Sequence, residues 1–141
     1  KHIEYDAQSY YGIRKANENI FGKGFIPSYD FTKAKTIVSI NADFICNWLL
    51  PSKFSTDFSK ARKPENGWMS KHFQFESVLS LTGANSDVRV KIKPSEEILV
   101  ASAILSSLNN QNSNPSLNEV TNEKIQSAVK SLLEKKEIHL L

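Results

Sequence analysis

The strongest structural signal in the sequence is a run of β-branched and apolar residues, Thr36-Ile37-Val38-Ser39-Ile40. This run ends abruptly at the polar turn Asn41-Ala42-Asp43. A strand with so few polar side chains is typical of a parallel sheet, because helices then cover both of its faces. The run therefore predicts a buried, central strand of an α/β domain.

Strands and helices alternate along the rest of the chain. Phe73 and Phe75 alternate with His72 and Gln74, which predicts a second strand over 71–76. The other expected elements are strands over 2–6, 88–92 and 138–141 and helices over 9–21, 51–62, 94–108 and 121–136. Polar or glycine-containing segments at 23–31, 80–87 and 109–120 are expected to be loops. This order predicts a three-layer, doubly wound, Rossmann-like α/β domain with a mainly parallel sheet.

Several helix positions can be assigned from local chemistry. Ser9 and Ser95 are expected to cap the starts of two helices, and Gly22 suits the position after a helix end. The helix after Pro51 is expected to bury Phe54, Phe58 and Ala61. Segment 98–108 is apolar on most faces, so we expect it to lie between the sheet and a further layer.

Length and composition indicate one domain over 1–141, in which 109–120 is a flexible connector and 121–141 a helix plus a strand. The net charge is +3, and the 18 basic residues form no run, which argues against a nucleic-acid partner. No apolar stretch approaches the roughly 18–20 residues that cross a bilayer, so no direct membrane span is expected. The first residue, Lys1, and the apolar last residues suggest a piece of a longer polypeptide.

The cysteine and histidine content argues against a metal centre in this part of the chain. An iron–sulfur cluster needs about four thiolates, and the only cysteine is Cys46. His2, His72 and His139 are far apart in sequence, which is not the spacing of a zinc site. Cys46 has no His or Lys next to it and is expected to be a buried, unreactive thiol.

Ligands of doubly wound sheets bind beyond the carboxyl ends of the strands. The candidate ligand-binding residues are therefore those that follow predicted strands: Asn41, Asp43, Glu76, Thr82, Asp87 and Glu97. Glu76 could accept hydrogen bonds from ribose hydroxyls, or be a solvated strand-end residue. The turn 41–43 has no glycine and carries a carboxylate, which argues against a diphosphate there.

Two further segments have alternative interpretations. The loop 82–87 could contact a cofactor or partner, or be a crossover turn whose Asn and Asp side chains bond their own backbone. The apolar stretch 44–50, with Trp48 and the later Trp68 and Met69, could be a docking patch or ordinary core. His72 is expected to fill space in a strand, and no Ser/His/Asp or Cys/His grouping suggests a nucleophilic enzyme.

Five segments in order resemble the molybdopterin oxidoreductase family: DFTKAKTIVS (30–39), NADF (41–44), MSKHFQFES (69–77), SLTGANSD (80–87) and IKPSE (92–96). Within the family they are most similar to the Tat-translocated iron–sulfur subunits of bacterial alternative complex III, a quinol:cytochrome c oxidoreductase. The resemblance covers most of 1–108. It implies the α/β fold of the middle domains of formate dehydrogenase- and DMSO reductase-type enzymes.

The resemblance also implies a function for the parent protein. It implies an exported subunit on the periplasmic side of the inner membrane, whose partners are other subunits of a membrane-bound respiratory complex. In catalytic relatives, residues matching Asn41 and Asp43 touch the molybdopterin guanine dinucleotide. Glu76 matches the Asp of an Asp-Pro-Arg motif, and Glu97 the Asp of a Pro-Gly-Thr-Asp motif.

This sequence departs from each of those motifs. The turn 41–43 lacks glycine, Glu76 is not followed by Pro-Arg, and Ser95 replaces glycine. The leading interpretation is a non-catalytic scaffold domain that holds no cofactor itself, with iron–sulfur clusters elsewhere in the parent chain. The alternatives are a genuine molybdopterin guanine dinucleotide-binding domain and a protein-docking module that uses 44–50.

Overall fold

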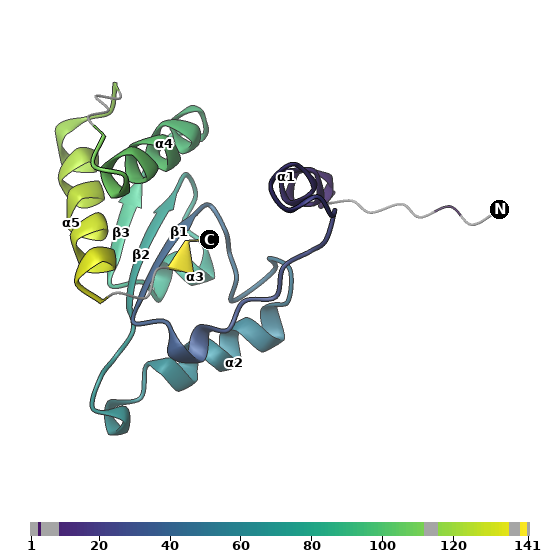
Figure 1. Cartoon of the computed structure of the whole chain (residues 1–141). Helices are drawn as coiled ribbons and strands as arrows, with labels where there is room; N and C mark the ends of the chain where they lie inside the picture. The colour runs from purple at the N-terminus through teal and green to yellow at the C-terminus, as the bar shows by residue number, and fades with distance from the viewer. Residues whose placement is uncertain (1–2, 4–8, 112–115, 136–138, 141) are drawn as a thin grey trace.

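The computed structural model describes residues 3, 9–111, 116–135 and 139–140. It is an α/β domain built on a parallel sheet in the order β3-β2-β1-β4 (Figure 1). The strands are β1 (Thr36–Ile40), β2 (Lys71–Glu76), β3 (Val88–Lys91) and the two-residue β4 (His139–Leu140). The helices are α1 (Tyr11–Phe21), α2 (Pro51–Ala61), α3 (Leu81–Ala84), α4 (Glu97–Leu108) and α5 (Glu119–Lys135). The prediction of an α/β domain with a parallel sheet is confirmed.

Helices lie on both faces of the sheet. On one face, α2 and the short 3-10 helix η1 (Phe31–Lys33) enclose an aromatic cluster of Phe31, Ala34, Ile37, Phe44, Phe54 and Phe58. On the other, α4 and α5 enclose a larger cluster that includes Val38, Phe73, Phe75, Val90, Val100, Ile104, Ile125 and Leu132. Each fully buried large side chain of this kind contributes about 1.5–3 kcal/mol. The arrangement is consistent with a Rossmann-like, doubly wound fold.

The buried face of α2 is the predicted one, since Phe54, Phe58 and Ala61 are all buried. The prediction for α4 is wrong. Only Val100, Ala103 and Ile104 on that helix are buried, while Ile98 is 80% and Leu105 57% exposed. The reason is that the described residues cover α4 only on the side of the sheet and α5, so its outer apolar side chains remain in solvent.

The segment predicted as a polar loop over 80–87 contains the four-residue helix α3. The Ser80 side chain caps it by accepting a hydrogen bond from the Gly83 N–H at 2.9 Å. At the other end of the chain, α5 begins two residues earlier than predicted because the Asn118 side chain accepts from the Thr121 N–H at 2.8 Å. The strand predicted over 138–141 is observed as β4, and the one over 2–6 lies outside the described residues apart from Ile3.

The two predicted serine caps have different outcomes. The N-cap position of α1 is occupied by Tyr10 and not by Ser9, although the Ser9 hydroxyl accepts from the Tyr11 N–H at 3.1 Å. Ser95 does not cap α4. A 3-10 helix, η3 (Pro94–Glu96), precedes it, and the Glu96 carboxylate accepts from the Lys93 N–H at 2.7 Å instead. The Glu96 carboxylate, three residues after Lys93, thus bonds the N–H at the start of η3 in place of a serine side chain.

Helix α1 stands apart from the sheet in Figure 1, and none of its residues is buried. Gly22 ends it in the left-handed conformation, with φ +72°, as predicted for the position after a helix end. The Asn17 side chain donates to the Phe25 carbonyl at 2.9 Å, which folds the following loop back on the helix. Contacts of α1 are therefore mainly with its own loop.

Candidate functional site

The carboxyl ends of β1 and β2 meet at one edge of the sheet, which we call the carboxyl edge. Asn41, directly after β1, has a left-handed backbone with φ +52°. Its N–H donates to the Phe75 carbonyl of β2 at 2.7 Å, which ties the turn to the neighbouring strand. Asparagine tolerates this conformation better than most residues do. The turn after β1 can therefore be tight without glycine.

Asp43 is the first acidic residue beyond β1, and the chain itself binds its carboxylate. Asp43 Oδ1 accepts from the Thr82 N–H at 3.0 Å and from the Thr82 hydroxyl at 2.7 Å. The Thr82 hydroxyl in turn accepts from the Ile45 N–H at 3.0 Å. The structure thus brings together two predicted site residues that are 39 positions apart, and these bonds join the β1 turn to the start of α3.

The Glu76 carboxylate, at the end of β2, is surrounded by donors. It is only 1% exposed, so the prediction of a solvated strand-end residue is wrong. It accepts from the Ser80 hydroxyl at 2.6 Å, the Ser80 N–H at 3.3 Å, the Gln74 side chain at 3.2 Å and the Arg89 guanidinium. These donors leave little acceptor capacity for a ribose.

Burial by itself raises the pKa of the Glu76 carboxyl. Hydrogen bonds from Ser80, Arg89 and Gln74 act in the opposite direction and outweigh burial, so the pKa lies below its ordinary value. Glu76 is therefore ionised at neutral pH, and Arg89 is its counter-ion.

Gly83 is required by this arrangement because a Cβ atom there would overlap the Glu76 carboxylate. Both residues lie where α3 crosses the end of β2. Glycine thus serves here for a close approach of backbone to side chain, since its φ is not in the left-handed region.

A row of buried polar side chains runs along β2 beneath α2. His72 Nε2 lies 3.2 Å from Gln74 Oε1, and the Gln74 amide donates to Glu76. The His72 ring also packs against Phe44 and Phe58, with centroids 5.3 and 5.5 Å away. Burial lowers the pKa of His72 to about 4, so the imidazole is neutral at physiological pH. The prediction that His72 fills space in a strand is confirmed.

Asp87 lies at the opposite end of the strands. Its N–H donates to the His72 carbonyl, and its carboxylate accepts from the His72 N–H at 2.7 Å and from Arg62 at 2.7 and 2.9 Å. Burial raises the pKa of Asp87, but the Arg62 and His72 donors lower it further than burial raises it. The prediction that the whole segment 82–87 lies at the carboxyl edge is therefore wrong for Asp87, because α3 carries the chain back to the start of β3.

Glu97 begins α4, beyond the carboxyl end of β3, and is half-buried. In the strand order, β3 is separated from β1 by β2. Asn41, Asp43, Thr82 and Glu76 therefore form one connected group, whereas Glu97 is peripheral and Asp87 is remote. The sequence analysis did not identify Ser80, Arg89 and Gln74 as donors to Glu76. Only Ser80 had a local sequence signal, as a serine three residues before the Gly83 N–H that it caps.

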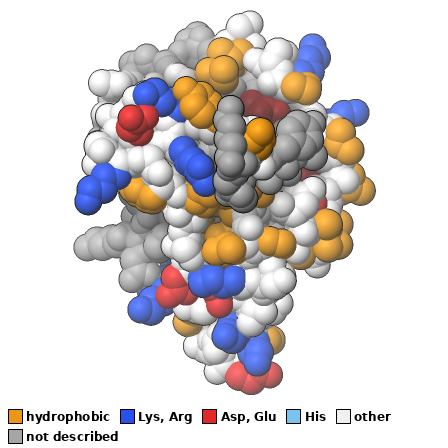
Figure 2. All heavy atoms as spheres, turned by 90° about the vertical axis from the view of Figure 1, so that its right-hand side faces the viewer, with side chains coloured by type: hydrophobic (Ala, Val, Ile, Leu, Met, Phe, Trp, Pro, Cys, Tyr) orange, Lys and Arg blue, Asp and Glu red, His pale blue; other side chains and the backbone are white. Residues whose placement is uncertain are grey.

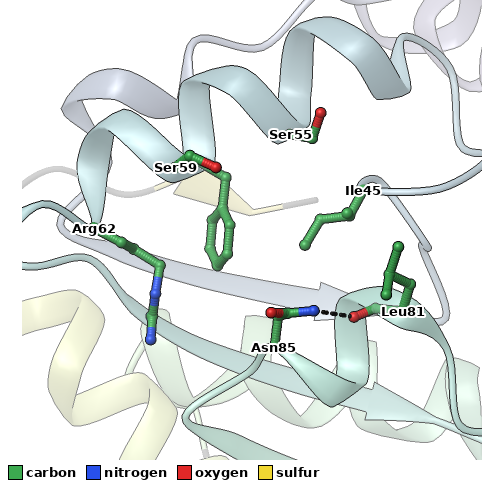
Figure 3. A pocket seen from close by; sticks show the side chains of 7 residues that line it. Ile45, Ser55, Ser59, Arg62, Leu81 and Asn85 are labelled. Carbon is green, nitrogen blue, oxygen red and sulfur yellow. Dashed lines mark hydrogen bonds between the residues drawn. The ribbon is translucent and has the colours of Figure 1, made fainter.

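A pocket of about 360 Å³ lies between α2 and α3 (Figure 3). Its lining residues are Ile45, Ser55, Phe58, Ser59, Arg62, Leu81 and Asn85. The Asn85 amide donates to the Leu81 carbonyl at 2.8 Å, and the Arg62 guanidinium is held by Asp87 and by the Ser70 carbonyl. The Arg62 guanidinium and the Asn85 amide group of the pocket are thus hydrogen-bonded within the chain.

The aromatic stretch 44–50 is partly core and partly surface. Phe44 is fully buried, and Trp48 is half-buried and stacked on Tyr29 with centroids 5.9 Å apart. Cys46 is exposed, so the prediction of a buried thiol is wrong. The reason is the turn that begins at Asp43, whose carbonyl accepts the N–H groups of residues 46, 47 and 48 and carries Cys46 outward.

The face of the molecule that carries α1 mixes apolar, basic and acidic side chains (Figure 2). Exposed apolar side chains of α1 and its loop include Tyr11, Ile20, Phe21 and Phe25. No group of three or more His, Cys, Asp or Glu side chains suitable for a metal occurs among the described residues. Within the same part of the chain, no helix is both long and apolar enough to cross a bilayer.

Comparison with known proteins gives no family assignment. No family model matches the sequence, and no curated protein matches it at a significant level.

Proposed function

We propose that this domain is a non-catalytic, molybdopterin oxidoreductase-like scaffold within an exported electron-transfer subunit. The parent protein would be the iron–sulfur subunit of a quinol:cytochrome c oxidoreductase on the periplasmic side of the inner membrane. Its partners would be the other subunits of that complex, and its clusters would be bound elsewhere in the parent chain. The five matching segments described above support the family.

The fold proposed in detail is the three-layer, doubly wound domain found in the middle of formate dehydrogenase- and DMSO reductase-type enzymes. Three features of the described chain support it. The strands are parallel, the helices cover both faces, and the order β3-β2-β1-β4 places the turn after β1 where such sheets bind ligands.

The observation that carries the scaffold proposal is that the carboxyl edge is satisfied by its own side chains. Asp43 is bound by Thr82, and Glu76 by Ser80, Gln74 and Arg89. A diphosphate brought to this edge would meet two carboxylates and find their donors already in use. Removing those donors from the carboxylates would cost about 1–3 kcal/mol for each group left unpaired. The residues present do not fit a pterin guanine dinucleotide.

The alternative is a domain that does bind the dinucleotide, with Asn41, Asp43, Glu76 and Glu97 around the guanine nucleotide. The position of Asn41 and Asp43 beside the junction of β1 and β4 favours it. The internal bonds of Asp43 and Glu76 argue against it more strongly, because both would have to be broken.

A titration separates the two. The purified chain is mixed with GDP, and its melting temperature and tryptophan fluorescence are followed. A ligand at 100 times its dissociation constant stabilises the folded state by about 2.7 kcal/mol. The scaffold proposal expects no saturable change. Saturable stabilisation, lost in Asp43→Ala, would establish the alternative.

A further inference from the structure

We propose that the outer edge of β3 is a docking site for an extended, acidic protein segment that adds to the sheet as another strand. This inference does not depend on the function proposed above. It concerns the side of the domain away from β1 and rests on the unpaired strand edge, the adjoining groove and its charge.

Strand β3 is the last strand of the order β3-β2-β1-β4. Its inner side is paired with β2 in the register Phe73↔Val88 to Glu76↔Lys91. Backbone groups of successive residues point to opposite sides of a strand. Because the Ile92 N–H donates inward to the Glu76 carbonyl, the backbone groups of Val88 and Val90 also face β2, and those of Arg89 and Lys91 face outward. Within 9–111 and 116–135, no hydrogen bond reaches this outer side of β3.

A groove of about 430 Å³ runs beside this edge, between β3 and the first turns of α5. Its lining residues are Arg89, Val90, Lys91, Asn118, Val120, Thr121 and Lys124. The far wall is fixed, since Asn118 caps α5 and Ile125 of the same helix is buried in the core. Val120 is 62% exposed and offers an apolar contact to one side chain of an incoming strand. The groove thus lies between the outer backbone edge of β3, unpaired among the described residues, and the first turns of α5, which the core holds in place.

The charge of the groove specifies the partner. Three of its seven lining residues are cations and none is acidic. Arg89 is already paired with Glu76, whereas Lys91 and Lys124 are exposed and make no ion pair in the described part of the chain. They come from opposite walls, so a strand lying between them could place acidic side chains near both. Complementary charges of this kind favour association and fix its register.

Two other occupants fit less well. Two copies of this chain meeting edge to edge would bring Lys91 and Arg89 of one against the same residues of the other, and charged edge strands discourage such pairing. Single-stranded nucleic acid is bound by aromatic side chains on which bases stack, and none lines this groove. An extended acidic peptide uses both the strand edge and the two lysines.

The test uses the whole 141-residue chain and a synthetic peptide of alternating Val and Glu. Binding is followed by fluorescence anisotropy of the labelled peptide and by amide exchange of the chain. We expect saturable binding that weakens with salt, together with new protection of the Arg89 and Lys91 amides. The absence of saturable binding overturns the proposal.

Variants and a second peptide separate strand pairing from simple charge attraction. Lys91→Glu combined with Lys124→Glu should weaken binding by about tenfold or more. Lys130→Glu, which reverses one charge on α5 outside the groove, should leave the affinity unchanged. Replacing each Val of the peptide by Pro keeps its charge but removes strand pairing, so binding should be lost.

Two results contradict the proposal even if the peptide binds. Equal affinity of the Pro-containing peptide would show that charge alone acts. Displacement of the peptide by an oligothymidylate of equal charge, without protection of Arg89 and Lys91, would point to nucleic acid instead. Because the Pro-containing peptide is tested on the unaltered chain, the proposal stays falsifiable even if a lysine variant folds poorly.

Discussion

The two faces of β2 are held by different forces. On the side of α4 and α5, Phe73 and Phe75 are buried in a cluster of aliphatic side chains. On the side of α2, His72, Gln74 and Glu76 are just as buried but are linked to one another by hydrogen bonds. Apolar packing tolerates volume-conserving changes, whereas removing the hydrogen-bond partner of a buried polar side chain costs free energy. Strand β2 thus contributes apolar packing on one face and a hydrogen-bonded row of polar side chains on the other.

The largest expected effect comes from breaking the apolar face. Phe73→Ala should reduce the free energy of unfolding by about 3–5 kcal/mol, because it leaves a cavity in the core. Ile98→Ala on α4 is the matched control: Ile98 is 80% exposed, so the change should stay within about 0.5 kcal/mol. Urea denaturation measures both. Equal effects would mean that the cluster around Phe73 is not the core.

Acidification should weaken the polar face before the apolar one. Burial depresses the pKa of His72 from 6.5 to about 4, so the unfolded chain takes up this proton first. Stability is then fully present above pH 6.5 and falls as the pH drops toward 4, by about 3 kcal/mol in total. The pKa values of Glu76 and Asp87 are also lowered, so these carboxylates add losses once the pH falls below their ordinary values of 4.5 and 3.8.

The variant His72→Gln isolates this effect. Denaturation midpoints measured between pH 7 and 5 should fall less steeply in the variant than in the parent chain. Identical slopes would show that the His72 ring is accessible to solvent and titrates normally.

Loss of the Glu76 charge should cost less than Phe73→Ala but should still be clear. Glu76→Gln weakens charge-assisted bonds from Ser80 and Arg89, and we expect a loss of about 1.5–3 kcal/mol in the free energy of unfolding. The same change at half-buried Glu97, at the start of α4, should cost less than about 1 kcal/mol. A larger effect at Glu97 would make that residue, and not Glu76, the structural carboxylate.

The smallest effect is expected at the contact between the two turns. Thr82→Val removes the hydroxyl that donates to Asp43 and accepts from Ile45, and should cost about 1–2 kcal/mol. Thr82→Ser keeps the hydroxyl and should recover most of this stability in thermal melts. If Thr82→Ser is as unstable as Thr82→Val, the methyl group of Thr82 and not its hydrogen bonds stabilises this contact.

Local patterns predicted the elements but not the partners of the site. The run 36–40 and the alternation of 71–76 indicate their strands directly. Both strands are buried on both faces, and the alternation in 71–76 separates an aromatic face from a polar one. Helix α3 escaped prediction because four residues cannot show a helical period. The exposed side of α4 escaped because an apolar sequence does not reveal whether a neighbouring layer is present.

The candidate site illustrates the same limit. Sequence position alone placed Asp43, Glu76 and Thr82 beyond strand ends, and the structure confirms that they lie together. The sequence could not show that Arg89, 13 residues beyond Glu76, neutralises the Glu76 carboxylate, because that contact depends on the pairing of β2 with β3. A carboxylate bound by its own chain and one free for a ligand look alike in sequence.

We conclude that the donors at the carboxyl edge are already in use within the folded chain. Native-state amide exchange of Thr82 and Gly83 tests it most directly, because their N–H groups donate to Asp43 and Ser80. We expect protection comparable with that of the β2 amides, unchanged when GDP is added. Exchange as fast as in the exposed residues Val78 and Leu79 would contradict it, because those donors would then be free for a ligand.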